Sequence, residues 1–382
     1  MKIFKILFLL IILIFTASCD FKEDYDEINI GCILPLKNYT VILGTETKNT
    51  LTLAVEQYNA NRNKSEPKIN LFFENGNWGK DESLYIKKYK KLKVEHDIDV
   101  LFISNYVGTL ALNRETEKDE VIIINPYLND DDYTTLNRDI FKLGVTIEDS
   151  NNVISERILE RKLKNIKIIC RDNIYNRNSA LAIKNFLDEE LVLSHIEMID
   201  ENKLNIPATI DDFENSNNEA MVLLGGMEMY KLLNECRKKG IKEPFFLGNN
   251  LPHERAKDTT AFVNLGDVEF TFFTSFDGNY ILANKFFIDY KKRFGKDATF
   301  TWVNMQAYDA MNLTINSLKD VNKAKVDEGE LNNWMRKNLF STRYYQGICG
   351  NLSISERGAV KGIHFSVYTI NPKGKIIKVR RD

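Results

Sequence analysis

Residues that mark repetitive or disordered chains are scarce in this sequence. Its 382 residues include only 7 Pro and 19 Gly, against 43% hydrophobic and 11% aromatic residues. The low proline and glycine content excludes a collagen-like or low-complexity chain, and the hydrophobic content is that of a protein that buries apolar cores. At roughly 100–200 residues per domain, the length predicts two domains.

Neither sign of charge is in large excess. The chain has 52 Lys and Arg against 54 Asp and Glu, a formal net charge of −2. No segment combines a dense basic stripe with interleaved aromatic side chains. Surfaces that bind nucleic acid are typically basic, so we expect no nucleic-acid partner.

Motifs that carry catalysis or hold metal ions are also lacking. The 4 His lie far from one another and from every cysteine, which excludes the spacing of zinc ligands. There is no G-x-S-x-G elbow, and GNWGK at 76–80 is too short for a phosphate-binding loop. Three aspartates at 130–132 lack the alternate spacing and distal Glu of a calcium loop and indicate a solvated turn. We therefore expect no enzyme, no metal ion and no cofactor.

The N-terminus is typical of a secretion signal. Residues 1–18 contain Lys2 and Lys5, then an uninterrupted apolar run at 6–15 and two small residues. A membrane span needs roughly 20 apolar residues, so this shorter run is expected to be a cleaved signal peptide. We predict that the protein is exported.

Cys19 follows this signal directly. Residues 16–19, Thr-Ala-Ser-Cys, resemble the lipobox of bacterial lipoproteins, in which the cysteine is acylated, although Thr16 stands where Leu is usual. The resemblance implies a lipidated tether over 19–27, with the protein held by acyl chains at the periplasmic or extracellular face of a cell membrane. The alternative is an ordinary exported protein whose Cys19 lies near the cleavage site by chance.

The remaining cysteines lie in segments that are predicted to be buried. Two are within apolar strand-like runs and one is in a helix-like segment, so free buried thiols are favoured over a disulfide framework or a metal site. These residues are Cys32, Cys170, Cys236 and Cys349.

Strand-like and helix-like segments alternate along the chain, which predicts parallel sheets covered by helices on both faces. The strand-like runs are at 28–34, 69–73, 99–103, 121–124, 166–170, 192–198, 220–224, 244–247 and 268–273. They exceed one typical doubly wound sheet, so we expect an α/β protein with two lobes. Later in the chain the order changes to helix patterns at 280–294, 302–319 and 329–338, followed by strands at 363–369 and 375–379.

Several motifs, taken in order, resemble the type I periplasmic solute-binding proteins of the leucine/isoleucine/valine-binding class, which serve ABC importers. The match starts with IGCILPL at 30–36 and LTLAVEQYNA at 51–60. It continues with DNIYN at 172–176, where Asn176 replaces a usual glycine. FIDYKKRFGKDA at 287–298, MQAYDAMNL at 305–313 and YQGICGNLSISERG at 345–358 complete it.

The resemblance implies two doubly wound parallel-sheet lobes joined by three hinge crossings, with ligand bound in the cleft between them. The implied N-lobe comprises residues 28–146 and 275–345, and the implied C-lobe comprises 147–274 and 346–382. Residues that follow strand C-termini should face the cleft, since helix N-termini there present backbone N–H groups and the positive ends of helix dipoles.

The resemblance also implies a set of ligand-binding residues, although the match to the amino-acid pocket is uneven. Tyr127 fills space that is usually open, Asn129 replaces Thr, and neutral Asn250 stands where an acidic residue often meets the ligand's ammonium group. Asp277 is then a substitute charge. The implied contacts are Tyr106, Gly108, Thr109, Tyr127, Asn129, Tyr175, Met227, Asn250, Phe276 and Asp277.

Five of these residues have a purely structural alternative. Tyr127 could cap the core, and Tyr175 could pack between lobes without touching ligand. Asn129 could form an Asx turn, and Thr109 could satisfy helix N-terminal donors. Asp277, with the glycine after it, could be only a turn.

The resemblance implies a lipid-anchored solute-binding protein that captures a small polar ligand, either an amino acid or an amide-like compound, for an ABC permease. The second hypothesis is a sensory or regulatory lipoprotein that uses the same fold to contact a receptor or cell-wall enzyme. The departures from the family's pattern at 105–109 and 125–129 favour this second hypothesis.

Overall fold

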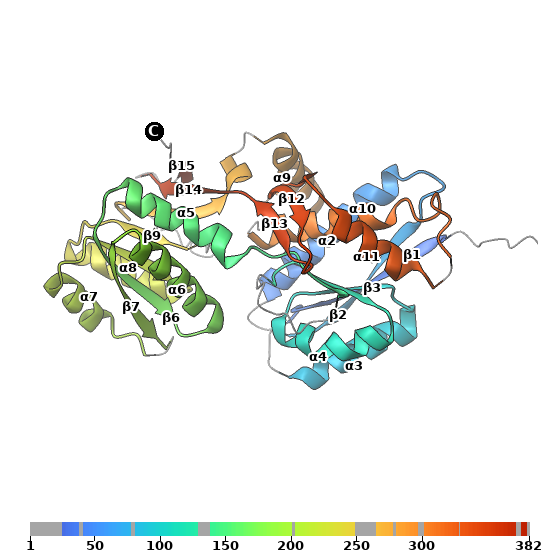
Figure 1. Ribbon diagram of the computed structural model, residues 1–382, viewed down its shortest axis with the longest axis horizontal. Coiled ribbons are helices and arrows are strands. Elements are labelled where there is room, and N and C mark those ends of the chain that lie inside the picture. Colours follow the sequence, from blue (N-terminus) through green and yellow to red (C-terminus); the bar gives the residue numbers. More distant parts are fainter. Residues whose placement is uncertain are drawn as a thin grey trace, which may run out of the picture.

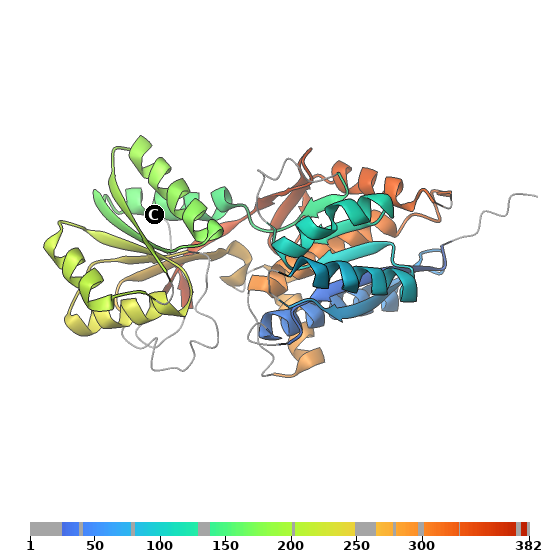
Figure 2. The same cartoon turned by 90° about the horizontal axis from the view of Figure 1, so that it is seen from below.

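The structure, a computed structural model, consists of two α/β lobes that lie side by side (Figures 1 and 2). It describes residues 25–37, 41–77, 81–128, 138–200, 203–248, 265–277, 280–296, 302–327, 329–371 and 376–379.

The first lobe is built on a parallel five-stranded sheet of order β2-β1-β3-β4-β5. Its strands are β1 (Glu27–Leu34), β2 (Lys68–Asn75), β3 (Val100–Ile103), β4 (Ile122–Asn125) and β5 (Ile140–Lys142). Helices pack on both faces of this sheet, two of them, α3 and α4, on one face and the others on the opposite face. These helices are α2 (Val41–Asn61), α3 (Glu82–His96), α4 (Tyr106–Lys118), α9 (Ile281–Phe294), α10 (Trp302–Leu318) and α11 (Leu331–Ser341).

The second lobe is built on a seven-stranded sheet of order β15-β14-β10-β9-β8-β6-β7, in which β14 and β15 are antiparallel to their neighbours. Its strands are β6 (Asn165–Arg171), β7 (Leu193–Ile199), β8 (Ala220–Leu224), β9 (Phe245–Leu247), β10 (Val268–Phe273), β14 (Phe365–Ile370) and β15 (Ile376–Lys378). Its helices are α5 (Ile147–Glu160), α6 (Ile174–Glu189), α7 (Ile206–Asn215) and α8 (Met227–Lys239). The first two cover one face and the last two cover the other.

Local sequence explains how these layers form. Every residue of β3, β4, β8, β9 and β10 is buried, as parallel strands covered on both faces require. Five helices that follow strands, α3 to α7, begin at side chains that accept a backbone N–H and so satisfy one of the unpaired donors of the first turn. These N-cap residues are Asp81, Asn105, Thr146, Asn173 and Asn205.

The chain passes between the lobes three times. It leaves the first lobe through residues 143–146, between β5 and α5, and returns through the 3₁₀ helix η3 (Thr274–Asp277), between β10 and α9. The third passage is at His364, the single residue between β13 and β14. The predicted α/β class, with two doubly wound lobes and three crossings, is confirmed.

A small antiparallel sheet lies on the first lobe just before the third passage. It consists of β11 (Tyr345–Gln346), β12 (Gly350–Ile354) and β13 (Val360–Ile363). Ile348 N and Cys349 N donate to the carboxylate of Asp309 in α10, and Ala359 bridges to Lys142 in β5. We therefore propose that residues 346–363 belong with the first lobe, and that the second lobe resumes at β14 rather than at the predicted 346.

Most predicted strands agree with the structure to within about two residues, but the sequence did not predict β5 or the sheet β11–β13. These strands have only 2 to 5 residues, and β12 and β13 include Gly350 and Gly362. Such short, glycine-containing segments carry no clear apolar period.

Cys32, Cys170, Cys236 and Cys349 are free and buried, as predicted. The predicted export segment and Cys19 lie outside the described residues. Within the described ranges, no helix combines the length and apolar character needed to cross a membrane.

Candidate functional site

The strands of both lobes end where the chain passes between the lobes. The first passage follows the end of β5, and the second follows the end of β10. The third passage precedes Phe365, which pairs with Phe273, the last residue of β10. Because parallel strands all end at one edge of a sheet, the C-terminal edges of the two sheets lie next to these passages. We call these the interlobe edges, and such an edge is where ligands bind in open α/β sheets.

On the first lobe, the turns after β3 and β4 are tied together by buried polar side chains. Thr109 Oγ1 donates to Asn105 O at 2.9 Å and accepts from Asn125 Nδ2 at 2.9 Å. Asn125 Oδ1 in turn accepts from the backbone N–H groups of Tyr127 and Leu128, each at 2.9 Å. The network fixes both turns in place.

The hydroxyl group of Thr109 therefore forms its hydrogen bonds within the protein. Its side chain is fully buried, and its hydroxyl already donates one hydrogen bond and accepts another. This geometry favours a structural role for Thr109, although its hydroxyl accepts from the Asn125 side chain and not from a helix N-terminal backbone donor as in the stated alternative. Direct contact between its hydroxyl and a ligand stays a prediction.

The backbone N–H of Gly108 also has a partner within its own turn. It donates to Asn105 Oδ1, the cap of α4, at 2.9 Å. A side chain would not fit here, because a Cβ on Gly108 would lie 2.6 Å from both Ile103 Cδ1 and Tyr85 Cδ1. The glycine is thus explained by close packing of α4. Half-buried Tyr106, the first residue of α4, lies on the interlobe side of this turn.

Tyr127 is anchored to two helices by its hydroxyl group. The hydroxyl lies 2.6 Å from Thr47 Oγ1 in α2 and donates to Val303 O in α10 at 3.2 Å. The ring makes an edge contact with Trp302, with centroids 5.3 Å apart. Burial raises the pKa of this phenol well above its ordinary value. These contacts favour the alternative in which Tyr127 caps the core.

Ser104 is a buried hydroxyl at the same edge that the sequence analysis did not single out. It directly follows β3, its side chain is 4% exposed, and its Oγ has no hydrogen-bond partner among the described residues. Leaving a buried hydroxyl unpaired costs roughly 1–3 kcal/mol. Its position directly after a strand is the feature by which sequence reasoning could have found it.

On the second lobe, an ion pair joins the end of β6 to the start of α8. Arg171 Nε donates to Glu228 Oε1 at 2.7 Å, and a second bond joins Arg171 Nη2 to Glu228 Oε2. Gly226 N also donates to Glu228 Oε1, at 2.8 Å. Burial alone would raise the pKa of Glu228, but the hydrogen bonds from Arg171 and Gly226 outweigh it and lower that pKa. The sequence analysis missed this pair because its members are 57 positions apart.

Helices α5 and α6, which begin at the second interlobe edge, carry further polar groups in their second turns. Asn151 Nδ2 and Ser179 Oγ are buried and have no hydrogen-bond partner among the described residues. Asn173 caps α6 by accepting from Asn176 N at 2.9 Å. Tyr175, the second residue of α6, is half-buried beside this cap. Its contact with ligand stays a prediction.

Four other predicted contacts are only partly described or not described. Asn129 and Asn250 lie outside the described residues. Met227 opens α8 and Asp277 closes η3, but their side chains also lie outside the described part.

Phe276 in η3 is half-buried in an aromatic cluster at the second passage. Its ring centroid lies 4.9 Å from that of Phe272 and 6.0 Å from that of Tyr368. Its contact with ligand stays a prediction.

Comparison with solved structures identifies the fold. The chain superposes on the substrate-binding protein LivJ of a branched-chain amino acid transporter from Streptococcus pneumoniae, crystallised with isoleucine, with a TM-score of 0.74 and 17% identity over 92% of this chain and 100% of the other. A leucine-binding protein, LivK, from Thermotoga maritima gives a TM-score of 0.73 and 14% identity over 92% and 98%. An ABC transporter substrate-binding protein from Sphaerobacter thermophilus gives 0.78 and 13% over 93% and 97%.

Searches against family models and against curated proteins found no match. At 13–17% identity, the structural likeness establishes the fold and leaves function to the site. The chain therefore has the type I periplasmic binding-protein fold, as predicted.

Proposed function

We propose that this protein is an extracytoplasmic solute-binding protein that holds a small polar ligand between its two lobes and has no catalytic activity. The observation that carries the proposal is Ser104. Its hydroxyl is buried and unpaired at the interlobe edge, while Asn105, Thr109 and Asn125 around it are hydrogen-bonded to one another. A bound ligand would supply the missing partner.

The chemistry of both edges supports a polar ligand. Ser104 and Ser179 can each donate and accept, whereas Asn151 Nδ2 is a donor. Glu228 is already neutralised by Arg171 and Gly226, so the second lobe does not present an open carboxylate at this position. Carboxamide and carboxylate groups satisfy such donors, which favours an amino acid or an amide-like compound.

Binding would operate by ligand-driven closure. A ligand shifts the equilibrium between open and closed states only by the difference in its affinity for them, so the closed state must add contacts from the second lobe. The solved neighbours are named as transporter substrate-binding proteins, one of them crystallised with isoleucine. By analogy, delivery would be to an ABC permease.

The anchoring of the protein is part of the same proposal. The export segment, the lipobox-like residues 16–19 and the acidic tether after them support acylation of Cys19 at the outer face of a membrane. Replacing Cys19 with Ser should abolish detergent-phase partitioning and acyl labelling. Equal partitioning of the variant and the wild type would contradict the anchor.

A thermal-shift screen tests the binding role. The soluble chain from residue 25 should be melted with amino acids, their amides, sugars and short peptides. Ligand at a hundred times its dissociation constant stabilises the folded state by about 2.7 kcal/mol, which raises the melting temperature by several degrees. We expect at least one amino acid or amide to produce such a shift.

The second candidate is a sensory or regulatory lipoprotein that contacts a receptor or a cell-wall enzyme. The observation that favours it is that the hydroxyl groups of Thr109 and Tyr127 form hydrogen bonds within the first lobe. The absence of any thermal shift across the whole screen would favour this candidate.

A further inference from the structure

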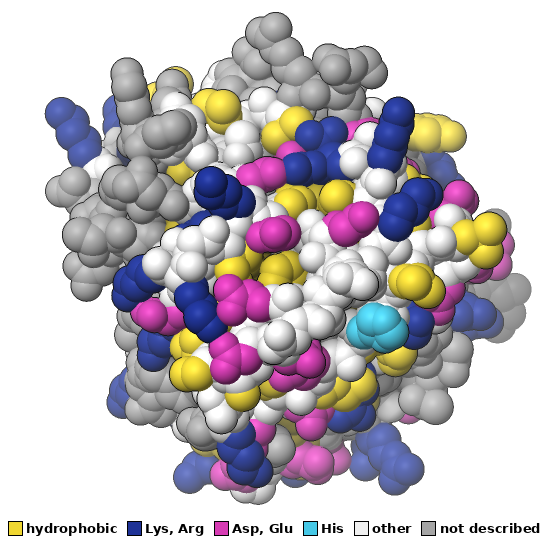
Figure 3. Space-filling view, turned by 90° about the vertical axis from the view of Figure 1, so that its left-hand side faces the viewer, with side chains coloured by type: hydrophobic (Ala, Val, Ile, Leu, Met, Phe, Trp, Pro, Cys, Tyr) yellow, Lys and Arg dark blue, Asp and Glu magenta, His cyan; other side chains and the backbone are white. Residues whose placement is uncertain are grey.

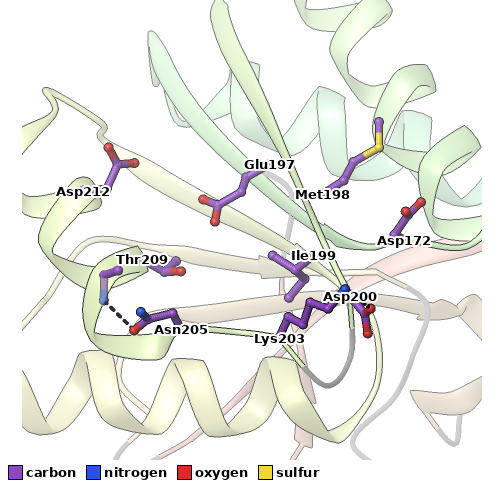
Figure 4. Close-up of a pocket in the computed structure, with 10 residues that line it drawn as sticks. Asp172, Glu197, Met198, Ile199, Asp200, Lys203, Asn205, Thr209 and Asp212 are labelled. Carbon is purple, nitrogen blue, oxygen red and sulfur yellow. Dashed lines mark hydrogen bonds and ion pairs between the residues drawn. The ribbon is translucent and has the colours of Figure 1, made fainter.

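A groove lies at the outermost strand of the second sheet, on the end of the second lobe shown in Figure 3. Acidic and hydrophobic side chains lie side by side in the middle of this face (Figure 3). The groove has a volume of about 750 Å³ and runs between the end of β7 and the first half of α7 (Figure 4). One end of the groove reaches the interlobe edge, because Asp172 and Asp200 directly follow β6 and β7, but none of the predicted ligand contacts lines it.

The lining of the groove is acidic. Among the described residues, Asp172, Glu197, Asp200 and Asp212 line it together with one cation, Lys203. The four carboxylate side chains are between 37% and 66% exposed. Each of them has an ion-pair partner and also stays partly exposed to solvent along the groove.

Neighbouring cations offset only part of this charge. Lys167 pairs with Glu197 at 2.8 Å and with Asp212, but its side chain is only 7% exposed, so it is covered by the carboxylates. Arg177 pairs with Asp172, and Lys203 pairs with Asp200 at 3.2 Å. Counting these three cations against the four carboxylates, the described residues of the groove carry a net charge of −1.

The backbone of β7 supplies a second, independent feature. Among the described strands, β7 pairs only with β6. Leu193 N donates to Lys164 O, and Ile199 O accepts from Asp172 N, so the odd-numbered residues of β7 face β6. In a parallel pair alternate residues point to opposite neighbours, so the backbone groups of Ile196 and Met198 face away from the sheet.

Apolar side chains accompany this open strand edge. Leu193 is 64% exposed and Met198 is 45% exposed. Figure 4 shows Glu197 and Met198 on opposite sides of β7, so an added strand would meet an acidic contact on one side and an apolar contact on the other.

We infer that this groove binds an extended basic segment of a partner protein, which adds to the sheet alongside β7. Backbone hydrogen bonds to Ile196 and Met198 would give affinity, and Lys or Arg at alternate positions would meet Glu197, Asp200 and Asp212. A compact cation would use the carboxylates but not the strand edge. An extended basic segment uses both features.

Fluorescence anisotropy with a labelled peptide tests the inference. The probe is an acetylated heptapeptide in which Lys and Val alternate, titrated against the soluble chain from residue 25. One control peptide has Glu in place of Lys, and a second has Pro in place of Val, which keeps the charge but removes every second backbone N–H. We expect saturable binding of the first peptide below about 1 mM, weakening as salt rises, and no saturation with either control.

Two variants separate the charge from the strand edge. Asp200→Asn with Asp212→Asn removes two groove charges and leaves Glu197 to pair with Lys167, so we expect at least tenfold weaker binding. Met198→Pro removes one outward N–H from the edge strand and should weaken binding similarly. The matched control, Glu160→Gln with Glu235→Gln, removes two charges elsewhere on the lobe and should leave binding unchanged.

Several results would overturn the inference. These are the absence of saturable binding, equal binding of the Pro-containing peptide, or equal loss of binding in the matched control. A concentration-dependent dimer that Met198→Pro abolishes would assign the edge to a second copy of the chain instead. If Met198→Pro fails to fold, the Pro-containing peptide tests the same backbone pairing.

Discussion

At the scale of single residues, the interlobe edge of the first lobe separates polar groups that are satisfied from one that is not. Thr109 and Asn125 bond to each other and to the backbone. Ser104, equally buried, has no partner within the described chain. A group that destabilises the folded protein on its own but lies at a binding edge is a candidate for function.

Ser104→Ala should therefore separate stability from binding. Removing an unpaired buried hydroxyl should leave the free energy of unfolding unchanged or raise it, whereas loss of its hydrogen bond should weaken binding by about 1 kcal/mol, roughly five- to tenfold. Denaturant unfolding and calorimetry with a ligand from the screen measure the two effects.

A matched serine provides the control for this prediction. Ser317 in α10 is also buried, but its hydroxyl donates to Thr314 O at 2.6 Å. Ser317→Ala should lower the free energy of unfolding by about 1 kcal/mol and leave affinity unchanged. If Ser104→Ala behaves in the same way, Ser104 does not contact ligand.

Tyr127→Phe tests whether this tyrosine is structural. The change removes a hydroxyl that bridges Thr47 and Val303 O and keeps the ring against Trp302. We expect a loss of about 1–2 kcal/mol in the free energy of unfolding, because two buried partners lose a bond, with affinity unchanged. A variant of wild-type stability with weakened ligand binding would instead place Tyr127 in the site.

At the scale of elements, α10 fixes the turn at 347–349, which contacts both the second and the third passage. The carboxylate of Asp309 accepts from Ile348 N at 2.8 Å and Cys349 N at 2.7 Å. Cys349 O accepts from His364 N at 3.0 Å, and Ser275 Oγ donates to Ile348 O. Gly347 is required here, since a Cβ would lie 2.5 Å from the Asp309 carboxylate.

Because the carboxyl group of Asp309 titrates, its contribution to the stability of the protein depends on pH. Burial raises its pKa from 3.8 to about 6, although the two backbone N–H groups act in the opposite direction. The folded state therefore holds the proton more tightly than the unfolded state. Its contribution to the free energy of unfolding falls as pH rises from about 4 to about 6 and is constant above that.

Asp309→Asn should change both the stability and its pH dependence. An amide offers one acceptor where the carboxylate offers two, so one N–H of the turn loses its bond, at a cost of about 1–3 kcal/mol near neutral pH. Part of the fall in stability between pH 4 and 6 should disappear, while the part due to Asp99, whose pKa burial also raises to about 6, should remain. Urea unfolding across this range measures both effects, and an unchanged pH profile would contradict the assignment.

At the scale of the whole molecule, the sequence was sufficient for the architecture. Long, apolar strands such as β1 and β8 alternate with helices whose buried faces recur at helical spacing, and this pattern predicted two doubly wound lobes. The short sheet β11–β13 escaped prediction because contacts with Asp309 and Lys142, far away in the chain, define it. Our proposed boundary of the second lobe, at β14, therefore lies later in the chain than the predicted 346.

The candidate site was harder to predict than the fold. Position after a strand end predicted residues at the interlobe edges, but it could not show which polar groups would form hydrogen bonds with their neighbours. Thr109 Oγ1 and Gly108 N form hydrogen bonds within their own turn, whereas Ser104 Oγ has no partner among the described residues. The pairing of Arg171 with Glu228 depends on β6 lying beside β8, the strand that precedes α8.

Ligand binding is proposed to draw the two lobes together. Small-angle scattering of the soluble chain, with and without the compound that gives the largest thermal shift, measures this motion directly. We expect a smaller radius of gyration at saturating ligand, and incomplete compaction when Tyr175→Ala removes contacts from the second lobe. A compound that stabilises the protein and leaves the radius of gyration unchanged would contradict binding between the lobes.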